Sequence, residues 1–191
     1  MNGVVHVGGH SGEEVDGYLK EGRSPIIVFE PQNLPHVVNP NVTWVPFALS
    51  DEECIAPLYI PHHITAAEGM DTQCASLLPV NERTAVASGW TITAKSRVDV
   101  PVTRFDMWAY ATGFQRGSCS LLCIDVNGLE ARVLRGFGTF LKDFQEIIVE
   151  CSCPPLYWGS TCAHMVAMEL AENGFHTEQE IPKHGDVRFI R

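Results

Sequence analysis

Three glycines lie in one short segment near the N-terminus, His6-Val7-Gly8-Gly9-His10-Ser11-Gly12. Glycine has no Cβ and tolerates positive φ, so a glycine-rich turn between a strand and a helix lets the backbone approach a ligand closely. The spacing of Gly8, Gly9 and Gly12 departs from the G-x-G-x-x-G pattern of dinucleotide-binding turns. The turn therefore favours a cofactor without a pyrophosphate over NAD, with tight packing and no ligand as the alternative.

Two carboxylates are the strongest candidates for a ligand site. Glu30 ends the apolar segment 26–29, at the place where an acidic side chain can accept hydrogen bonds from both hydroxyls of a ribose. Asp125 lies in the continuous apolar segment 121–126, which is typical of a central parallel strand. In a doubly wound sheet that strand lies beside the first one, where ligands bind. We therefore expect Asp125 to hold the cationic end of a cofactor or to orient an acceptor nucleophile.

Two further polar residues, Asn127 and Glu130, follow Asp125. A helix cap made by Asn127, with a capping box completed by Glu130, is the structural alternative to a functional role. A divalent cation held by Asp125 and Asn127 is a second alternative, since carboxylate and amide oxygens are its usual ligands. No second carboxylate partner for such a metal can be located from the sequence.

The segments around these residues resemble, in order, motifs of the FkbM family of methyltransferases. Residues 5–12 resemble its D-V-G-A-N-x-G, Phe29-Glu30-Pro31 is identical to its F-E-P, and Val45-Pro46-Phe47-Ala48-Leu49-Ser50-Asp51 resembles its v-x-x-A-L-S-D, where adenine is usually contacted. Residues 123–136 resemble K-I-D-V-E-G-A-E-x-x-V-L-x-G. Weaker matches are Cys74-Ala75-Ser76-Leu77, at the place of the substrate-side motif G-A-S-S, and Thr103-Arg104-Phe105-Asp106, at the place of T-L-D.

The resemblance implies a methyltransferase that uses S-adenosyl-L-methionine, leaves S-adenosyl-L-homocysteine, and methylates a hydroxyl of a small molecule, sugar or natural product. The cofactor-binding residues that it implies are His6, Gly8, Gly9, His10, Gly12, Glu30, Pro31, Ser50, Asp51 and Asp125. The catalytic candidates are Asp125, His10 and Asn127, and the acceptor-binding candidates are Ser76, His62, His63 and Glu130. Imidazole titrates near neutral pH and suits a general base, although His62 and His63 could equally be a solvated loop pair.

The chain also departs from the family pattern. His6 replaces the Asp of the first strand, His10 an Asn, Cys123 a Lys, and Asn127 the Glu of D-V-E-G. An amide at position 127 removes a possible general base or an acceptor for the cofactor's ammonium group. A non-catalytic subunit that keeps the fold, and binds the cofactor or a partner protein, is therefore the alternative function.

Alternating strands and helices must position these residues. Apolar patterns predict strands at 3–7, 26–29, 42–49, 56–60, 98–102, 121–126, 146–151, 176–181 and 187–190, and helices at 11–22, 129–141 and 162–172. We expect an α/β, Rossmann-like, doubly wound and mostly parallel seven-stranded sheet that ends in an antiparallel hairpin, the class I methyltransferase fold. The chain should form a single domain, 1–191, with residues 61–97 as a loop or insertion over the acceptor site.

The composition limits the partners. A net charge of -10, with 13 Lys and Arg residues scattered singly, argues against nucleic acid, and no apolar segment is long enough to span a membrane. A cytoplasmic location, a small-molecule or saccharide acceptor and no metal are expected, and a homodimer is kept open. Of seven cysteines, Cys119, Cys123 and Cys151 are expected to be reduced core residues, while zinc held by Cys151, Cys153, Cys162 and His164 is an alternative.

Overall fold

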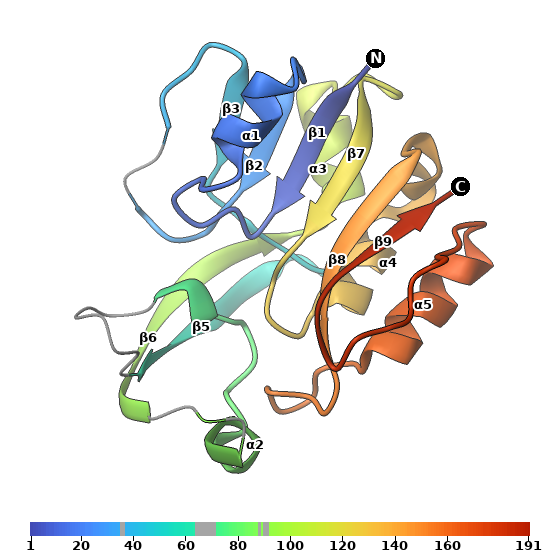
Figure 1. Ribbon diagram of the computed structural model, residues 1–191. Helices are drawn as coiled ribbons and strands as arrows, with labels where there is room; N and C mark the ends of the chain where they lie inside the picture. Colours follow the sequence, from blue (N-terminus) through green and yellow to red (C-terminus); the bar gives the residue numbers. More distant parts are fainter. Residues whose placement is uncertain (35–36, 64–71, 88, 90–91) are drawn as a thin grey trace.

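The computed structural model describes residues 1–34, 37–63, 72–87, 89 and 92–191, and its main element is a sheet with the strand order β3-β2-β1-β7-β8-β9. The strands are β1 (Gly3–Val7), β2 (Ile26–Phe29), β3 (Val42–Val45), β7 (Cys119–Ile124), β8 (Glu146–Ser152) and β9 (His184–Ile190). Neighbouring strands are parallel from β3 to β8, whereas β9 runs antiparallel to β8 (Figure 1). The strand order changes direction between β1 and β7, where open α/β sheets bind their ligands.

Helices lie on both faces of this sheet. α1 (Val15–Lys20) packs against the face that carries alternate side chains of β1, β2 and β7. α3 (Phe105–Thr112), α4 (Glu130–Phe137), the 3-10 helix η2 (Gly138–Asp143) and α5 (Ala163–Glu172) lie on the other face (Figure 1). Successive side chains of a strand point to opposite faces, so strands covered on both faces need apolar residues at every position. This explains the unbroken apolar segments of β2 and β7.

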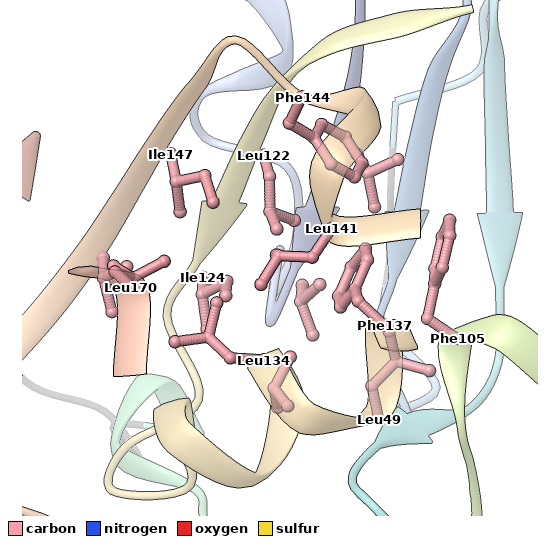
Figure 2. Close-up of a cluster of buried hydrophobic side chains, with 14 of the residues drawn as sticks. Leu49, Phe105, Leu122, Ile124, Leu134, Phe137, Leu141, Phe144, Ile147 and Leu170 are labelled. Atoms are coloured by element: carbon pink, nitrogen blue, oxygen red, sulfur yellow. The ribbon is translucent and has the colours of Figure 1, made fainter. Parts of the chain in front are cut away.

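The larger core lies between the sheet and α3, α4 and α5 (Figure 2). Leu122 and Ile124 of β7 pack there with Leu134 of α4, and all three are almost fully buried. The rings of Phe105 and Phe137 stack with their centroids 4.1 Å apart. This packing fixes α4 against the sheet, and therefore holds its first residue, Glu130, near the carboxyl end of β7.

A second, three-stranded sheet has the order β4-β6-β5. It consists of β4 (Ala48–Leu49), β5 (Cys54–His63) and β6 (Ile92–Thr103), with β5 and β6 paired antiparallel from Cys54 and Val102 to His63 and Ile92. The predicted strand 42–49 is thus divided at Pro46, because β3 stays at the edge of the main sheet and β4 joins the second one. Proline cannot donate a hydrogen bond to a sheet, which explains the division.

Within the expected loop or insertion 61–97, the described residues include regular structure. Residues 61–63 belong to β5 and 92–97 to β6, and η1 (Thr72–Cys74) and α2 (Glu82–Ala87) lie between the two strands. Side chains of the hairpin are widely exposed, for example Ile55 at 69% and Val98 at 47%. The sequence predicted the middle of these strands, at 56–60 and 98–102. A hairpin without a fully buried face has no strong period of two, and the parts at 61–63 and 92–97 were therefore not predicted as strand.

The end of the chain also differs from the expectation. Residues 176–181 form no strand, and His176 makes a single bridge to Ile190. The main sheet has six strands among the described residues, and β8 and β9 are joined through α5 and are not a hairpin. The mostly parallel α/β fold is confirmed, whereas the seven-stranded arrangement with a terminal hairpin is not. None of the helices that the structure describes has the length and apolarity needed to cross a membrane.

Candidate cofactor cleft and neighbouring carboxylates

A cleft opens at the carboxyl ends of β1, β2 and β7, and encloses about 520 Å³ of empty space, open solvent included. The residues that line it come from six separate segments, and include Gly8, His10, Glu30, Pro31, Phe47, Ala48, Leu49, Leu58, Gln73, Ala75, Ser76, Asp125 and Asn127. Seven of the predicted site residues therefore meet in one place.

The glycine turn lies on the floor of the cleft. Gly8 has a φ of 86°, and a Cβ at this residue would overlap the backbone oxygen of Asp125. A Cβ at Gly9 would overlap Val28, and one at Gly12 would lie 3.0 Å from the indole of Trp44. Gly8 lines the cleft itself, whereas Gly9 and Gly12 permit the close packing of the turn against its neighbours.

His6 lies outside the cleft. Its side chain is buried beneath α1, with Nδ1 3.2 Å from the hydroxyl of Tyr18, and that hydroxyl donates to the Cys123 sulfur at 3.1 Å. Burial lowers the pKa of His6 to about 4. The ring is therefore neutral at pH 7 and belongs to the smaller core, not to the ligand site.

Glu30 presents a pre-oriented carboxylate to the cleft. Its Oε2 accepts the backbone N–H of His10 at 2.9 Å, and its Oε1 accepts that of Gln32 at 2.8 Å. Only 8% of the residue is exposed, and burial raises the pKa of this carboxyl group above its ordinary value. Each carboxylate oxygen has two lone pairs, so each keeps one for a ligand hydroxyl. This is the arrangement that a vicinal diol requires.

Residues 72–77, which we name the covering segment, contribute four lining residues to the cleft. His10 contacts this segment through Nε2, 2.7 Å from the Thr72 hydroxyl, while its Nδ1 lies 2.9 Å from the Glu13 carboxylate. Gln32 donates its side-chain amide to the Thr72 carbonyl oxygen at 3.2 Å. Both ring nitrogens of His10 are thus engaged, which makes it a better anchor for the segment than a general base.

Asn127 anchors the other end of the covering segment. Its Nδ2 donates to the carbonyl oxygens of Gln73 and Ala75 at 2.8 and 3.2 Å, and its backbone oxygen accepts the Ser76 hydroxyl at 2.7 Å. The Tyr157 hydroxyl donates to the Cys74 carbonyl oxygen at 2.9 Å and lies 3.3 Å from Asn127 Oδ1. A glutamate could not donate these hydrogen bonds, which explains an amide at this position.

The predicted cap by Asn127 is wrong. The N-cap of α4 is Leu129, with no side-chain cap, and the left-handed φ of 56° at Asn127 directs its amide to the covering segment. The Glu130 side chain points back towards the preceding turn, where its Oε1 accepts the backbone N–H of Gly128 at 2.7 Å. The expected capping box would have required the backbone N–H of Asn127 instead. The Glu130 side chain is buried, and burial raises its pKa to about 7.

Asp125 has a carboxylate neighbour that sequence reasoning missed. β7 and β8 pair in register up to Ile124 and Val149, so Asp125 lies beside Glu150, and the two side chains are hydrogen-bonded. Partial desolvation at the foot of the cleft, together with the negative charge of Glu150, raises the pKa of Asp125. A polar residue at the end of a strand predicted to be buried was the signal in the sequence, but the neighbouring strand had to be known.

Other predicted site residues lie elsewhere. Asp51 forms ion pairs with Arg132 and Arg135 of α4, at 2.7 and 3.2 Å, and the Ser50 hydroxyl donates to Asp51. Phe47 and Ala48, from the same segment, line the cleft in their place. His62 and His63 lie at the end of β5, and their side chains are outside the described residues.

The cysteines are divided between core and surface. Cys119, Cys123 and Cys151 are free and buried, as expected. Cys153 and Cys162 form a disulfide, with His164 close to both sulfur atoms. The bond occupies two of the four proposed zinc ligands, and Cys151 is not part of the cluster.

The strand order defines an open α/β protein with a cleft at the switch point of its main sheet. The Methyltransferase FkbM domain family matches residues 6–177, and the chain belongs to this family. The fold is similar to the crystal structure of Methyltransferase FkbM from Methylobacillus flagellatus KT, with a TM-score of 0.55 at 9% sequence identity. The match covers 100% of this chain and 43% of that one, so the chain spans less than half of that protein. No curated protein matches the sequence.

Proposed function

We propose that the chain binds S-adenosyl-L-methionine in the cleft and transfers the methyl group to a hydroxyl of a small molecule, sugar or natural product. The main support for this proposal is the Glu30 carboxylate, which accepts hydrogen bonds from the backbone N–H groups of His10 and Gln32. Each of its oxygens keeps one lone pair for a hydroxyl of a ribose diol. Family membership supports the methyltransferase activity. The methyltransferase proposed from the sequence is thus retained, and the structure suggests where its cofactor would bind.

The residues around Glu30 fit the rest of this cofactor. Phe47 and Leu49 would supply an apolar wall for the purine, on the side of the cleft near β4. Gly8 leaves the floor free of side-chain atoms, and Asp125 lines the opposite end with a carboxylate. When bound, the cofactor supplies an electrophilic methyl group on a positively charged sulfur, which an acidic residue stabilises electrostatically. We place the amino acid end near Gly8 and Asp125.

Asp125 and Glu150 are the best candidates to receive the acceptor proton. The C–S bond of the donor breaks as the C–O bond of the methyl ether forms, and the hydroxyl proton must pass to a base. The raised pKa of Asp125 brings this pair closer to the operating pH of a general base than an ordinary carboxylate. We assign His10 and Asn127 to positioning of the covering segment, because their side chains are already hydrogen-bonded to it.

Calorimetric titration with S-adenosylmethionine and S-adenosylhomocysteine tests the cofactor site. We expect both to bind, and expect Glu30→Gln to weaken binding by about 10-fold to 100-fold, since hydrogen bonds to a charged group contribute about 1.5–3 kcal/mol. Glu21→Gln is the matched control, because Glu21 is exposed and pairs with Arg23 outside the cleft. Failure of the wild-type protein to bind either compound would exclude the proposal.

The same samples separate an enzyme from a non-catalytic subunit. Release of S-adenosylhomocysteine in the presence of a panel of hydroxylated acceptors identifies the enzyme, whereas tight binding without release favours the subunit. The homodimer and the cytoplasmic location remain predictions. The Cys153–Cys162 disulfide weighs against the second, since such bonds persist mainly in oxidising compartments.

A further inference from the structure

A second cavity adjoins the cofactor cleft on the far side of the turn that follows β7. It encloses about 280 Å³ of empty space, open solvent included, and shares Asn127 with the cleft. Its walls come from the start of α4, the end of β8 and the loop before α5, through Glu130, Glu150, Ser160 and Thr161. Asp125 lines the cleft, and Glu150, its neighbour on β8, lines the second cavity. The carboxyl pair therefore lies between the two cavities.

One wall of this cavity carries a hydroxyl without a partner. The Thr161 side-chain oxygen is buried and makes no hydrogen bond to any described residue. The neighbouring Ser160 hydroxyl, in contrast, donates to the Tyr157 carbonyl oxygen at 2.9 Å. A buried polar atom without a partner costs free energy, which a ligand with a hydrogen-bonding group would recover. Thr161 therefore brings an unused hydrogen-bonding atom to the wall of this cavity.

Acidic side chains lie beside the same cavity. Glu150 is the register partner of Asp186 on β9 and the neighbour of Asp125 on β7, so three acidic residues lie in a row across adjacent strands. Like charges opposite each other destabilise a sheet. The nearby basic group is His184, whose Nε2 lies 3.7 Å from Glu150 Oε1 and whose side chain is 59% exposed. Burial raises the pKa of both Asp125 and Glu150, so this pair does not carry two full charges. Any charge on the row is nevertheless negative, which disfavours an anionic ligand and favours a cation.

We propose that this second cavity receives an ammonium group of the methyl acceptor, next to the hydroxyl that is methylated. The inference rests on the proposed methyltransferase function, because the cavity adjoins the cleft assigned to the cofactor. An ammonium group has three N–H donors and no acceptor, which suits the Glu150 carboxylate and the Thr161 hydroxyl oxygen together. A carboxylate or phosphate at this place would face the acidic row. The acceptor class is therefore an amino alcohol or an amino sugar.

Nuclear magnetic resonance of the ¹⁵N-labelled full chain, with S-adenosylhomocysteine present, tests the charge preference. Ethanolamine, ethylene glycol and glycolate are the probes, because they are similarly small and differ in charge. We expect ethanolamine to shift the amide signals of Gly128 and Thr161, with an affinity at least about 10-fold higher than that of the other two. Equal or tighter binding of ethylene glycol or glycolate overturns the proposal, and so does displacement of ethanolamine by equimolar Mg²⁺.

Two variants and a control locate the ammonium group. Glu150→Gln should remove the preference for ethanolamine, while Glu146→Gln, which changes the charge equally but lies in an ion pair with Arg188, should keep it. Thr161→Val should weaken ethanolamine binding several-fold without loss of stability, because the hydroxyl has no partner among the residues that the structure describes. Unchanged affinity in both Glu150→Gln and Thr161→Val contradicts the assignment.

Calorimetry with S-adenosylhomocysteine distinguishes failure of this inference from failure of the proposed function. If the cofactor binds but ethanolamine is not preferred, the proposed methyltransferase function is kept and the amine-containing acceptor is rejected. An ethanolamine preference without cofactor binding overturns the role as acceptor site, since the cavity would then bind amines for another purpose.

Discussion

The side-chain amide of Asn127 donates to the backbone carbonyl oxygen of Gln73 at 2.8 Å, and so connects the turn after β7 to the segment that covers the cleft. A second donation, to Ala75, uses the same nitrogen. These contacts link the floor of the proposed cofactor site to its cover. The Asn at this position therefore holds the covering segment, which the Glu of the family pattern could not do by donation.

Asn127→Asp tests this role of the amide. Aspartate has a similar shape and also tolerates the left-handed backbone, but it lacks both N–H donors. We expect S-adenosylhomocysteine to bind about 10-fold more weakly and to dissociate faster, as two hydrogen bonds of about 0.5–1.5 kcal/mol are lost. Stopped-flow fluorescence and calorimetry measure the two quantities. Asn127→Gly, which loses the amide without added charge, should weaken binding and speed dissociation in the same way. If S-adenosylhomocysteine dissociates from both variants at the wild-type rate, the amide does not hold the covering segment over the cofactor.

Gly8→Ala tests the close approach at the floor of the cleft. A Cβ at Gly8 would overlap the Asp125 backbone oxygen, whereas one at Gly22 would meet nothing within 4 Å, although both glycines have positive φ. Gly22→Ala should therefore show the backbone strain alone, about 1–2 kcal/mol. We expect Gly8→Ala to lose at least about 2 kcal/mol more in urea unfolding. Equal losses would mean that the turn relaxes without cost.

The buried carboxyl group of Glu130 predicts a dependence of stability on pH. Burial raises its pKa from 4.5 to about 7, so the folded state holds the proton over a range in which the unfolded state has lost it. Its contribution to the free energy of unfolding is complete below about pH 4.5 and disappears as the pH rises towards 7. In Glu130→Gln, the fall in stability between these pH values should be smaller by about 3 kcal/mol.

Urea unfolding at pH 4.5, 6.0 and 7.5 measures this effect. Glu172→Gln, an exposed residue at the end of α5, is the control and should keep the wild-type slope. The raised pKa of Asp125 acts in the same direction, so some slope should remain in Glu130→Gln. Identical slopes in Glu130→Gln and the wild type would show that Glu130 is ionised in the folded state.

The disulfide between Cys153 and Cys162 should stabilise the fold, and its reduction should lower the free energy of unfolding. Cys153 and Cys162 close a short loop that contains Tyr157, the residue whose hydroxyl holds the covering segment at Cys74. A cross-link over a loop of about ten residues contributes about 3 kcal/mol by restricting the unfolded chain. We expect dithiothreitol or Cys162→Ser to lower the free energy of unfolding by this amount, while Cys54→Ser, at an exposed free cysteine, does not.

Alkylation under denaturing conditions, followed by mass spectrometry, checks the pairing directly. Before reduction, five of the seven cysteines should react, and after reduction all seven. Seven reactive cysteines in the unreduced protein would show that the bond is absent.

The arrangement of the main sheet could be predicted from the sequence because the strands of this sheet are buried on both faces. Unbroken apolar segments mark β2 and β7, and Glu30 and Asp125 follow directly from the ends of these strands. Of the hairpin of β5 and β6, only the segments 56–60 and 98–102 were predicted as strands, because side chains such as Ile55 and Val98 are exposed and the apolar pattern is weak.

Residues of one motif were also separated by the fold. His6 and Gly8 are two positions apart, yet His6 points beneath α1 while Gly8 lies at the cleft, because the strand ends between them. Asp51 was expected at the adenine, but the arginines of α4 bind it instead. A motif in the sequence gives the place of a segment, and the direction of each side chain depends on what packs against it.

By itself, the sequence determined the family, the mostly parallel sheet and the two carboxylates at its carboxyl edge, because strand burial and the residue that follows a strand are local properties. The tertiary structure alone decided that Glu150 lies beside Asp125, that Asn127 binds the covering segment, and that Thr161 opens on a second cavity. These relationships join residues that are 25 to 54 positions apart, or come from different strands and loops. They arise from strand register and helix packing, which no local pattern encodes.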